Sequence, residues 1–158
     1  MACLSFFRWL GIHDISNEGT FVYDSTGEPI GFTDWTNGEP NNDGGEGDCV
    51  VHWQHWANED VLGWNDRSCD YRTPVVCEAH ELANFNLVEE ITIKQMTSAN
   101  DLVFKIGGIV YSYSSKKASF VSAQQHCAKY GGKLFEPKSK ATYTEVEKKL
   151  QALGLERW

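Results

Sequence analysis

Side chains with oxygen donors concentrate between residues 14 and 66, and no Lys or Arg lies between those two positions. Carboxylate and amide oxygens set in glycine-rich loops suit Ca²⁺, which takes about 6–8 of them. Solvated acidic loops are the alternative, but like charges gathered this closely repel one another and a bound cation removes that penalty. We therefore predict a calcium-binding region here. The candidate metal ligands are Asp14, Glu18, Glu39, Asn41, Asn42, Glu46, Asp48, Asn65 and Asp66.

Other residues with catalytic or metal-binding potential form weaker patterns. His52 and His55 resemble half of a zinc site, but in an extended segment they would point to opposite faces, and no cysteine or acidic partner is evident. Packing or solvent exposure is the simpler interpretation. The neighbouring Trp53 and Trp56 suit either the core or stacking on a sugar ring. The sequence has no Gly-x-Ser-x-Gly, His-Glu-x-x-His or phosphate-loop motif, so we predict that it is not an enzyme.

The composition argues against two classes of partner. The chain has 158 residues, 41% of them hydrophobic, which suits one globular domain. No apolar run approaches the ~18 residues that indicate a membrane helix. Its 14 Lys and Arg against 22 Asp and Glu give a net charge of −8 and a pI near 5.0, the wrong sign for neutralising phosphates. We expect neither nucleic-acid binding nor membrane insertion.

Cysteine usage indicates the compartment. The five Cys, at positions 3, 49, 69, 77 and 127, include no Cys-x-x-Cys pair, so neither a zinc knuckle nor a thioredoxin-type motif is present. Disulfides are then the favoured use, with one thiol left over. Because disulfides persist in oxidising environments, we expect a secreted, extracellular protein.

Turn-forming residues divide the chain into parts of different character. Residues 1–80 alternate short apolar pieces with long loops rich in Gly, Asn and Pro, which predicts strands and loops. Residues 81–100 form a connector. Residues 101–158 begin with an alternating pattern that predicts a hairpin over 100–114, followed by two amphipathic segments. We predict helices from a Ser115 cap to about Tyr130 and over 142–153, and hence an α+β fold.

The motifs of residues 9–78 resemble the C-type lectin domain, in that family's own order. They are Trp9-Leu10-Gly11-Ile12, Phe32-Thr33-Asp34-Trp35, Gly38-Glu39-Pro40-Asn41, Gly47-Asp48-Cys49-Val50, Trp64-Asn65-Asp66 and Val75-Val76-Cys77-Glu78. The second half resembles the opening part of the same domain, through the hairpin up to Ser114, Gly131-Gly132-Lys133-Leu134 and the helix that leads to Glu156-Arg157-Trp158. The halves therefore stand in reversed order.

Three arrangements explain this reversal. Our main prediction is one circularly permuted domain over residues 1–158, with 1–80 as the family's C-terminal half and 101–158 as its N-terminal half. Such a permutation would require little structural change, because the two termini of a domain often lie close together. The others are a fragment that spans two tandem domains and a homodimer in which each half completes the partner chain. The dipeptide Arg-Trp occurs at both 8–9 and 157–158, as if the cut left an overlap.

The resemblance implies disulfides Cys49–Cys69 and Cys77–Cys127, and two small calcium sites in long loops beside small antiparallel sheets. The principal site would use Glu39, Asn41, Asn65 and Asp66, closed by Glu46. The auxiliary site would use Asp14, Glu18, Asn42, Glu46 and Asp48. The family's usual glutamate stands two residues before the cysteine, where this chain has Gly47, so Glu46 departs from the pattern by one step. The Glu39–Pro40 bond is expected to be cis.

The resemblance also implies the ligand. Glu-Pro-Asn, present as residues 39–41, goes with mannose, fucose, glucose and N-acetylglucosamine, whose equatorial vicinal hydroxyls would bind a calcium ion while pairing with its ligands. The carbohydrate-binding residues would be Glu39, Asn41, Glu46, Asn65 and Asp66. A module that uses calcium only structurally and binds protein, mineral or ice is the alternative, and a hydrolase is the least favoured.

Overall fold

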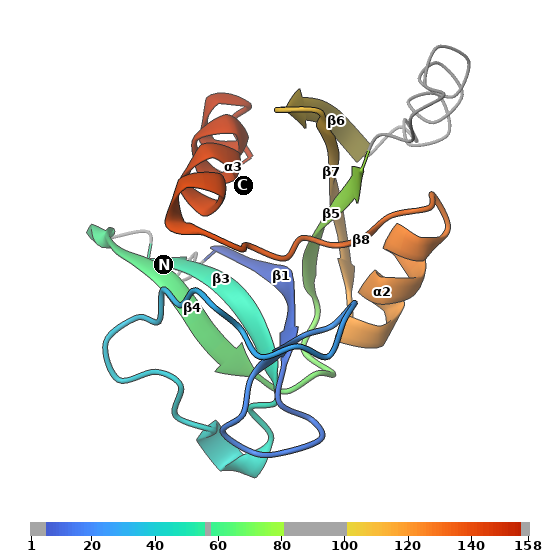
Figure 1. Cartoon of the computed structure of the whole chain (residues 1–158). Coiled ribbons are helices and arrows are strands. Elements are labelled where there is room, and N and C mark those ends of the chain that lie inside the picture. The colour runs from blue at the N-terminus through green and yellow to red at the C-terminus, as the bar shows by residue number, and fades with distance from the viewer. Residues whose placement is uncertain (1–5, 56–57, 81–100, 156–158) are drawn as a thin grey trace.

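In the computed structural model, the described residues are 6–55, 58–80 and 101–155, and they form an α+β fold (Figure 1). The connector 81–100, Cys3 and the Arg-Trp pair at 157–158 lie outside the described residues. The elements in chain order are β1 (Phe6–His13), β2 (Val22–Tyr23), a 3₁₀ turn (Asp43–Gly45), β3 (Cys49–His55), β4 (Asn58–Arg67), β5 (Thr73–His80), β6 (Asp101–Ile106), β7 (Ile109–Ala118), α2 (Phe120–Ala128), β8 (Lys133–Leu134) and α3 (Lys140–Ala152).

One mixed sheet joins the strands in the order β4-β3-β1-β5-β7-β6, while β2 pairs with β1 and β8 pairs with β5. β1 and β5 run parallel, with Trp9 opposite Val75, and the other pairings are antiparallel. Residues 6–80, whose motifs resemble the C-type lectin domain, supply β1 to β5. β7 pairs with the edge of β5 that faces away from β1. The predicted hairpin is confirmed as β6 and β7, although β7 extends to Ala118.

The sheet carries an apolar core on each face, because successive side chains of a strand point to opposite sides. On one face, Leu10 and Val50 pack with Val146 and Leu150 of α3. On the other, Trp9 and its neighbours pack with Phe120, Ala123 and Cys127 of α2. The two helices lie on either side of the strands in Figure 1. The amphipathic patterns of the sequence therefore correspond to helices that each bury one face.

Both helices begin at a serine cap, but not where the sequence indicated. Ser119, rather than Ser115, caps α2 by accepting a hydrogen bond from the Ser122 amide. The segment before it stays extended because Ala118 pairs with Thr73 and its carbonyl accepts a hydrogen bond from Trp9 Nε1 at 2.8 Å. Ser139 caps α3 in the same way, so that helix begins two residues before the predicted position 142. Within the described residues, no helix is long and apolar enough to span a bilayer.

Two disulfides form as the resemblance implied, Cys49–Cys69 and Cys77–Cys127. The second joins residues that are 50 positions apart and ties β5 to α2. In the chain-entropy model, closing a loop of that length stabilises the fold by about 4 kcal/mol. This bridge therefore fastens residues 1–80 to residues 101–155.

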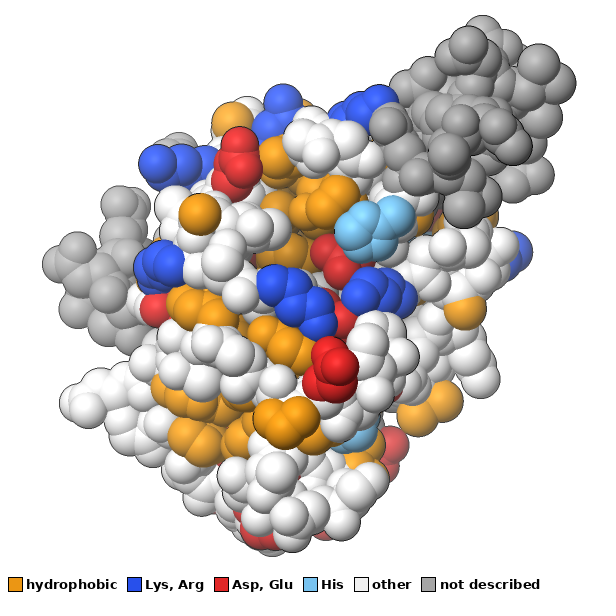
Figure 2. Space-filling model, in the orientation of Figure 1, with side chains coloured by type: hydrophobic (Ala, Val, Ile, Leu, Met, Phe, Trp, Pro, Cys, Tyr) orange, Lys and Arg blue, Asp and Glu red, His pale blue; other side chains and the backbone are white. Residues whose placement is uncertain are grey.

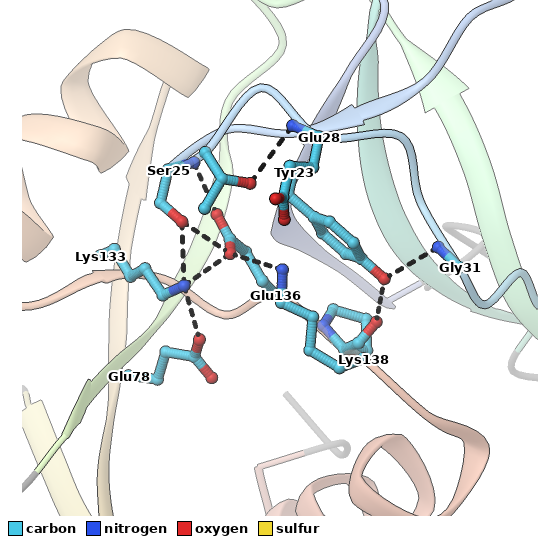
Figure 3. Close-up of polar contacts among 10 residues, drawn as sticks. Tyr23, Ser25, Glu28, Gly31, Glu78, Lys133, Glu136 and Lys138 are labelled. Carbon is cyan, nitrogen blue, oxygen red and sulfur yellow. Dashed lines mark hydrogen bonds and ion pairs between the residues drawn. The ribbon is translucent and has the colours of Figure 1, made fainter.

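A buried carboxylate also fastens the two parts (Figure 3). Glu136, which is 2% exposed, accepts hydrogen bonds from the Ser25 amide at 2.7 Å and the Ser25 hydroxyl at 2.9 Å. Lys133 Nζ lies 2.5 Å from Glu136 and 3.4 Å from Glu78. Burial raises the pKa of Glu78 to about 7, although the Lys133 charge opposes that shift. The network anchors the loop that follows β2 to the segment around β8.

A second buried polar cluster lies under α3. Arg8 of β1 forms an ion pair with Glu147 of α3, and His52 Nδ1 of β3 lies 2.6 Å from the Tyr143 hydroxyl. All four side chains are almost fully buried. Burial, assisted by the Arg8 charge, holds the pKa of His52 well below its usual 6.5. The imidazole therefore sits neutral inside the core.

The neutral His52 predicts an acid-sensitive stability that one substitution removes. The unfolded chain takes up a proton at this histidine near pH 6.5, whereas the folded protein does not. The free energy of unfolding should therefore fall by up to about 1.4 kcal/mol per pH unit below 6.5 from this group alone. His52→Gln should flatten that part of the pH dependence in urea denaturation between pH 7 and 5.

The exposed His80 provides the matched control, since His80→Gln removes a histidine without touching the core. An unchanged slope in His52→Gln, or an equal change in His80→Gln, would contradict a buried neutral imidazole.

Candidate functional site

The last residues of β4 carry two of the candidate ligands. Asn65 and Asp66 lie opposite Val51 and Val50 of β3, and both are almost fully buried. The chain at 34–36 lies along this part of β4, with the Trp64 amide donating to the Asp34 carbonyl at 2.7 Å and the Thr36 amide donating to the Trp64 carbonyl at 3.0 Å. This pairing fixes where the following loop starts.

Aromatic packing and one lysine hold the same loop. Trp64 is fully buried and makes edge contacts with the rings of Phe32 and Trp35. Lys140 of α3 reaches both Asp34 carboxylate oxygens, at 2.7 and 2.8 Å. The Glu39 amide then donates to the Thr36 carbonyl at 3.0 Å, which begins the turn that contains the Glu-Pro-Asn motif. The motif is thus positioned from β4 on one side and α3 on the other.

Asp66 organises the Glu-Pro-Asn turn. Its two carboxylate oxygens accept hydrogen bonds from the amides of Asn41 at 3.0 Å and Asn42 at 2.6 Å. The Glu39–Pro40 bond is cis, as expected. Asn41 Nδ2 donates to Glu39 Oε1 at 3.0 Å. These hydrogen bonds bring together three of the predicted principal ligands, Glu39, Asn41 and Asp66, while the fourth, Asn65, precedes Asp66 in β4.

This group contains buried oxygens that the described part of the chain leaves without hydrogen bonds. They are Oε2 of Glu39 and Oδ1 of Asn65. Burial, a hydrogen bond to Asp66 and the Asp66 charge together raise the pKa of Glu39 to about 7, while the Arg67 charge opposes the shift. An unsatisfied buried oxygen costs about 1–3 kcal/mol, and a cation bound to the Glu39 carboxylate would satisfy its free oxygen and relieve the repulsion by Asp66. These donors therefore fit a calcium ion.

The auxiliary set gathers beside the first one. Asp14 accepts a hydrogen bond from the Gly19 amide at 2.7 Å through Oδ2, and its buried Oδ1 is without a partner in the described residues. Burial and the Asp48 and Asp66 charges raise the pKa of Asp14. Burial and the charges of Asp14, Asp48 and Asp66 likewise raise the pKa of Glu18, against a hydrogen bond from Asn42. The Asp14 amide also donates a hydrogen bond to the Asp48 carbonyl at 3.0 Å, so the backbones of these two candidates are in direct contact.

The predicted ligand Glu46 stands apart from the hydrogen bonds that link Asp66 with Asn41 and Asn42. Its side chain is exposed, and no hydrogen bond or ion pair links it to the other candidates within residues 6–55 and 58–80. Residue 47 is buried instead, and its amide donates to Asn42 Oδ1 at 2.9 Å. No group of three or more His, Cys, Asp or Glu side chains in the described ranges is arranged to hold a metal.

Two further candidates from the sequence, His52 and Trp53, contribute to packing. His52 packs in the core, as the simpler interpretation predicted. The ring of Trp53 stacks with that of Phe7 at a centroid distance of 6.4 Å. The sequence analysis missed Arg67, whose charge acts on Glu39. Its position directly after Trp64-Asn65-Asp66 was the available signal.

Comparison with known proteins supports the resemblance for the half that holds this site. Residues 5–79 match the model of the lectin C-type domain. Over 70 residues, 44% of this chain, the sequence is 39% identical to salivary C-type lectin 2 of Aedes albopictus, covering 46% of that protein. The same extent is 40% identical to pulmonary surfactant-associated protein D of Bos taurus, covering 17% of it. The match thus spans less than half of either relative.

A solved structure is similar over a comparable part. The C-type lectin CEL-I from Cucumaria echinata is 29% identical, with 41% of this chain and 43% of that chain covered and a TM-score of 0.33. Residues 5–79, which match the lectin C-type domain model, contain every candidate ligand. These comparisons do not cover residues 101–158, so the reversed order of the halves stays a prediction from the sequence motifs.

The geometry around residue 47 predicts that this position tolerates only glycine. A Cβ there would lie 2.6 Å from Asp66 Oδ2 and 2.9 Å from Asn42 Cα, and the second contact is with backbone. Gly47→Ala should therefore lower the free energy of unfolding by about 1–3 kcal/mol, the usual cost of overpacking. Urea denaturation in chelator measures the effect without a contribution from metal.

Gly31 is the matched control, because nothing lies within 4 Å of a Cβ built there. Gly31→Ala should change the stability by less than about 0.5 kcal/mol. Equal effects of the two substitutions would show that the Asp66 contacts do not constrain the loop.

Proposed function

We propose that this protein is a calcium-dependent lectin that binds mannose-type glycans, including fucose, glucose and N-acetylglucosamine. The observation that carries the proposal is that Glu39 and Asn65 each keep a buried oxygen without a hydrogen-bond partner among the described residues, while Asp66 holds the turn that carries Glu39. They lie in the segment that is similar to a lectin C-type domain. Residues Glu39, Asn41, Asn65 and Asp66 would hold the principal ion. Asp14, Glu18, Asn42 and Asp48 would hold the auxiliary ion, and Glu46 would complete either set after its side chain moves inward.

Calcium, when bound, supplies positive charge and open coordination positions for sugar hydroxyls. The chain's own groups supply the selectivity. A carboxylate such as Glu39 accepts a hydrogen bond from a hydroxyl, whereas the Asn41 and Asn65 amides donate one. Two vicinal equatorial hydroxyls can then be fully paired, each as donor and as acceptor. Unpaired polar groups would penalise sugars whose hydroxyls present the opposite order.

A lectin-like module that uses calcium only to shape its loops and binds protein, mineral or ice is the second candidate. That alternative is supported by Asp66, because its carboxylate shapes the turn through two backbone amides and so has a structural role apart from sugar binding. The complete Glu-Pro-Asn and Trp-Asn-Asp set favours sugar binding, since loop shaping alone does not require every one of those side chains. Metal dependence of sugar retention separates the two.

We also propose that residues 1–158 form one circularly permuted domain. The support is that Phe6 and Leu155 line the same pocket, so the first and last described residues approach one another. The sheet, the Cys77–Cys127 bridge and the Arg8–Glu147 ion pair all cross between the halves within one chain. A swapped homodimer would make the same contacts between two chains. The disulfides and the names of the salivary and surfactant relatives support a secreted location.

The lectin proposal predicts retention on mannose-agarose in Ca²⁺ and release by EDTA. A single sugar should bind weakly, at about millimolar affinity, because a shallow site buries little area. A dense column or glycan array compensates through multivalency.

The specificity control is the double variant Glu39→Gln with Asn41→Asp, which exchanges an acceptor for a donor at one position and the reverse at the other. We expect its preference to move toward galactose on the array. Retention that survives EDTA, or a variant with the parent's specificity, would reject this function.

The single-domain proposal predicts a monomer of 17.8 kDa by light scattering after size exclusion. Non-reducing gels should give the same mass, because Cys77 and Cys127 pair within one chain. A particle of twice that mass, held together by disulfides until reduction, would instead identify the swapped dimer.

A further inference from the structure

A pocket lies at the start of β1, away from the candidate calcium ligands. Phe6, Phe7 and Arg8 at the start of β1 line it, together with Arg72 and Thr73 before and within β5. The candidate ligand Asp14 follows the other end of the same strand. Eight residues of extended chain separate the two ends, which corresponds to roughly 20 Å or more. The pocket is therefore distinct from the proposed sugar site.

An irregularity in the sheet builds one wall of this pocket. Thr73 pairs with Ala118 and Val75 pairs with Ser114, so three residues of β7 lie opposite Pro74 alone. Proline has no amide hydrogen for a ladder bond, which explains why the pairing is interrupted there. The extra residues include Lys117, which lines the pocket. A hydrogen bond of 2.6 Å from the Thr73 hydroxyl to the Phe7 carbonyl fixes the opposite wall.

The pocket is cationic although the protein is acidic. Arg72 and Lys117 are exposed lining residues, and neither forms an ion pair with another described residue. Arg8 also lines the pocket, but Glu147 balances its charge. Among the described residues, no Asp or Glu contributes to the lining, in a chain with 22 acidic and 14 basic residues. On the face shown in Figure 2, by contrast, basic and acidic side chains lie side by side.

Aromatic rings complete the pocket beside these cations. Tyr71 is 40% exposed, and its ring meets that of Phe7 edge to face at 5.4 Å. The Arg67 guanidinium lies over the other side of this cluster, 5.4 Å from the Phe7 ring centre. An exposed aromatic face can stack against the apolar face of a ring-shaped ligand, and unpaired Arg and Lys attract an anionic group.

We propose that this pocket binds an anionic sugar unit, one that bears a sulfate ester or a carboxylate, without calcium. The anion would pair with Arg72 and Lys117 while the sugar ring rests on Tyr71. The space of about 100 Å³ would hold the anionic group and part of one sugar ring, with the rest of a longer glycan outside the pocket.

The test measures binding in EDTA, which disables the proposed calcium site and so keeps the two proposals independent. Titration of N-acetylglucosamine 6-sulfate, followed by saturation-transfer NMR, should show saturable binding that weakens with salt. N-acetylglucosamine itself should show none. Glucuronic acid, as a second arm, tells whether a carboxylate replaces the sulfate.

Substitutions locate the site. Arg72→Gln and Lys117→Gln should each weaken binding about five-fold to ten-fold, as expected for loss of one charge-assisted contact. Tyr71→Ala should weaken it by a similar factor. The double variant Lys148→Gln with Lys149→Gln removes two exposed charges from α3 and should have no effect. Circular dichroism confirms that each variant is folded.

Three results would overturn the proposal. The first is the absence of binding to either anionic sugar in EDTA. The second is binding that is indifferent to Arg72 and Lys117 or lost in the α3 double variant. The third is tighter binding of a sulfotyrosine peptide than of the sulfated sugar, which would assign the pocket to a protein partner.

Discussion

The Asp66 carboxylate is the contact on which the candidate site depends. It is buried at the end of β4 and accepts hydrogen bonds from two successive backbone amides of the loop that carries the Glu-Pro-Asn motif. Burial is the main cause of the raised pKa values of Glu39, Asp14 and Glu18, and the Asp66 charge adds to each of them, so Asp66 acts on both candidate sets. One negative charge thus shapes the loop and creates the repulsion that a cation would relieve.

The remainder of the fold keeps Asp66 and the loop in place. Trp64 fixes the end of β4 from inside the core, and the 34–36 segment pairs with it from outside. That segment is tied to α3 through Lys140, and α3 is tied to the sheet through Glu147 and Tyr143. The site therefore depends on groups from both halves of the chain, although all of its candidate ligands belong to one half.

Local motifs could be interpreted from the sequence, whereas long-range contacts could not. Trp64-Asn65-Asp66 and Glu39-Pro40-Asn41 identified the candidate residues, and the cysteine spacing within the resemblance gave both disulfides. The Arg8–Glu147 pair joins residues 139 positions apart, and no periodicity indicates it. The start of α2 was misplaced because the pairing of Ala118 with Thr73 extends β7 beyond Ser115. Glu46 was expected to reach the ligands, but residue 47 occupies the buried position against Asp66.

The candidate ligands and the two helices come from different halves of the chain, and this separation affects how the sequence can evolve. β1 to β5 and every proposed ligand come from residues 6–80, while α2 and α3 come from residues 101–155. The second half meets the first along the free edge of β5 and through the buried faces of two helices. Apart from Lys140, which holds Asp34, drift in the solvent-facing positions of those helices would leave the loops with the candidate ligands untouched. Selection on ligand preference and selection on folding robustness can therefore act on separate stretches of the gene.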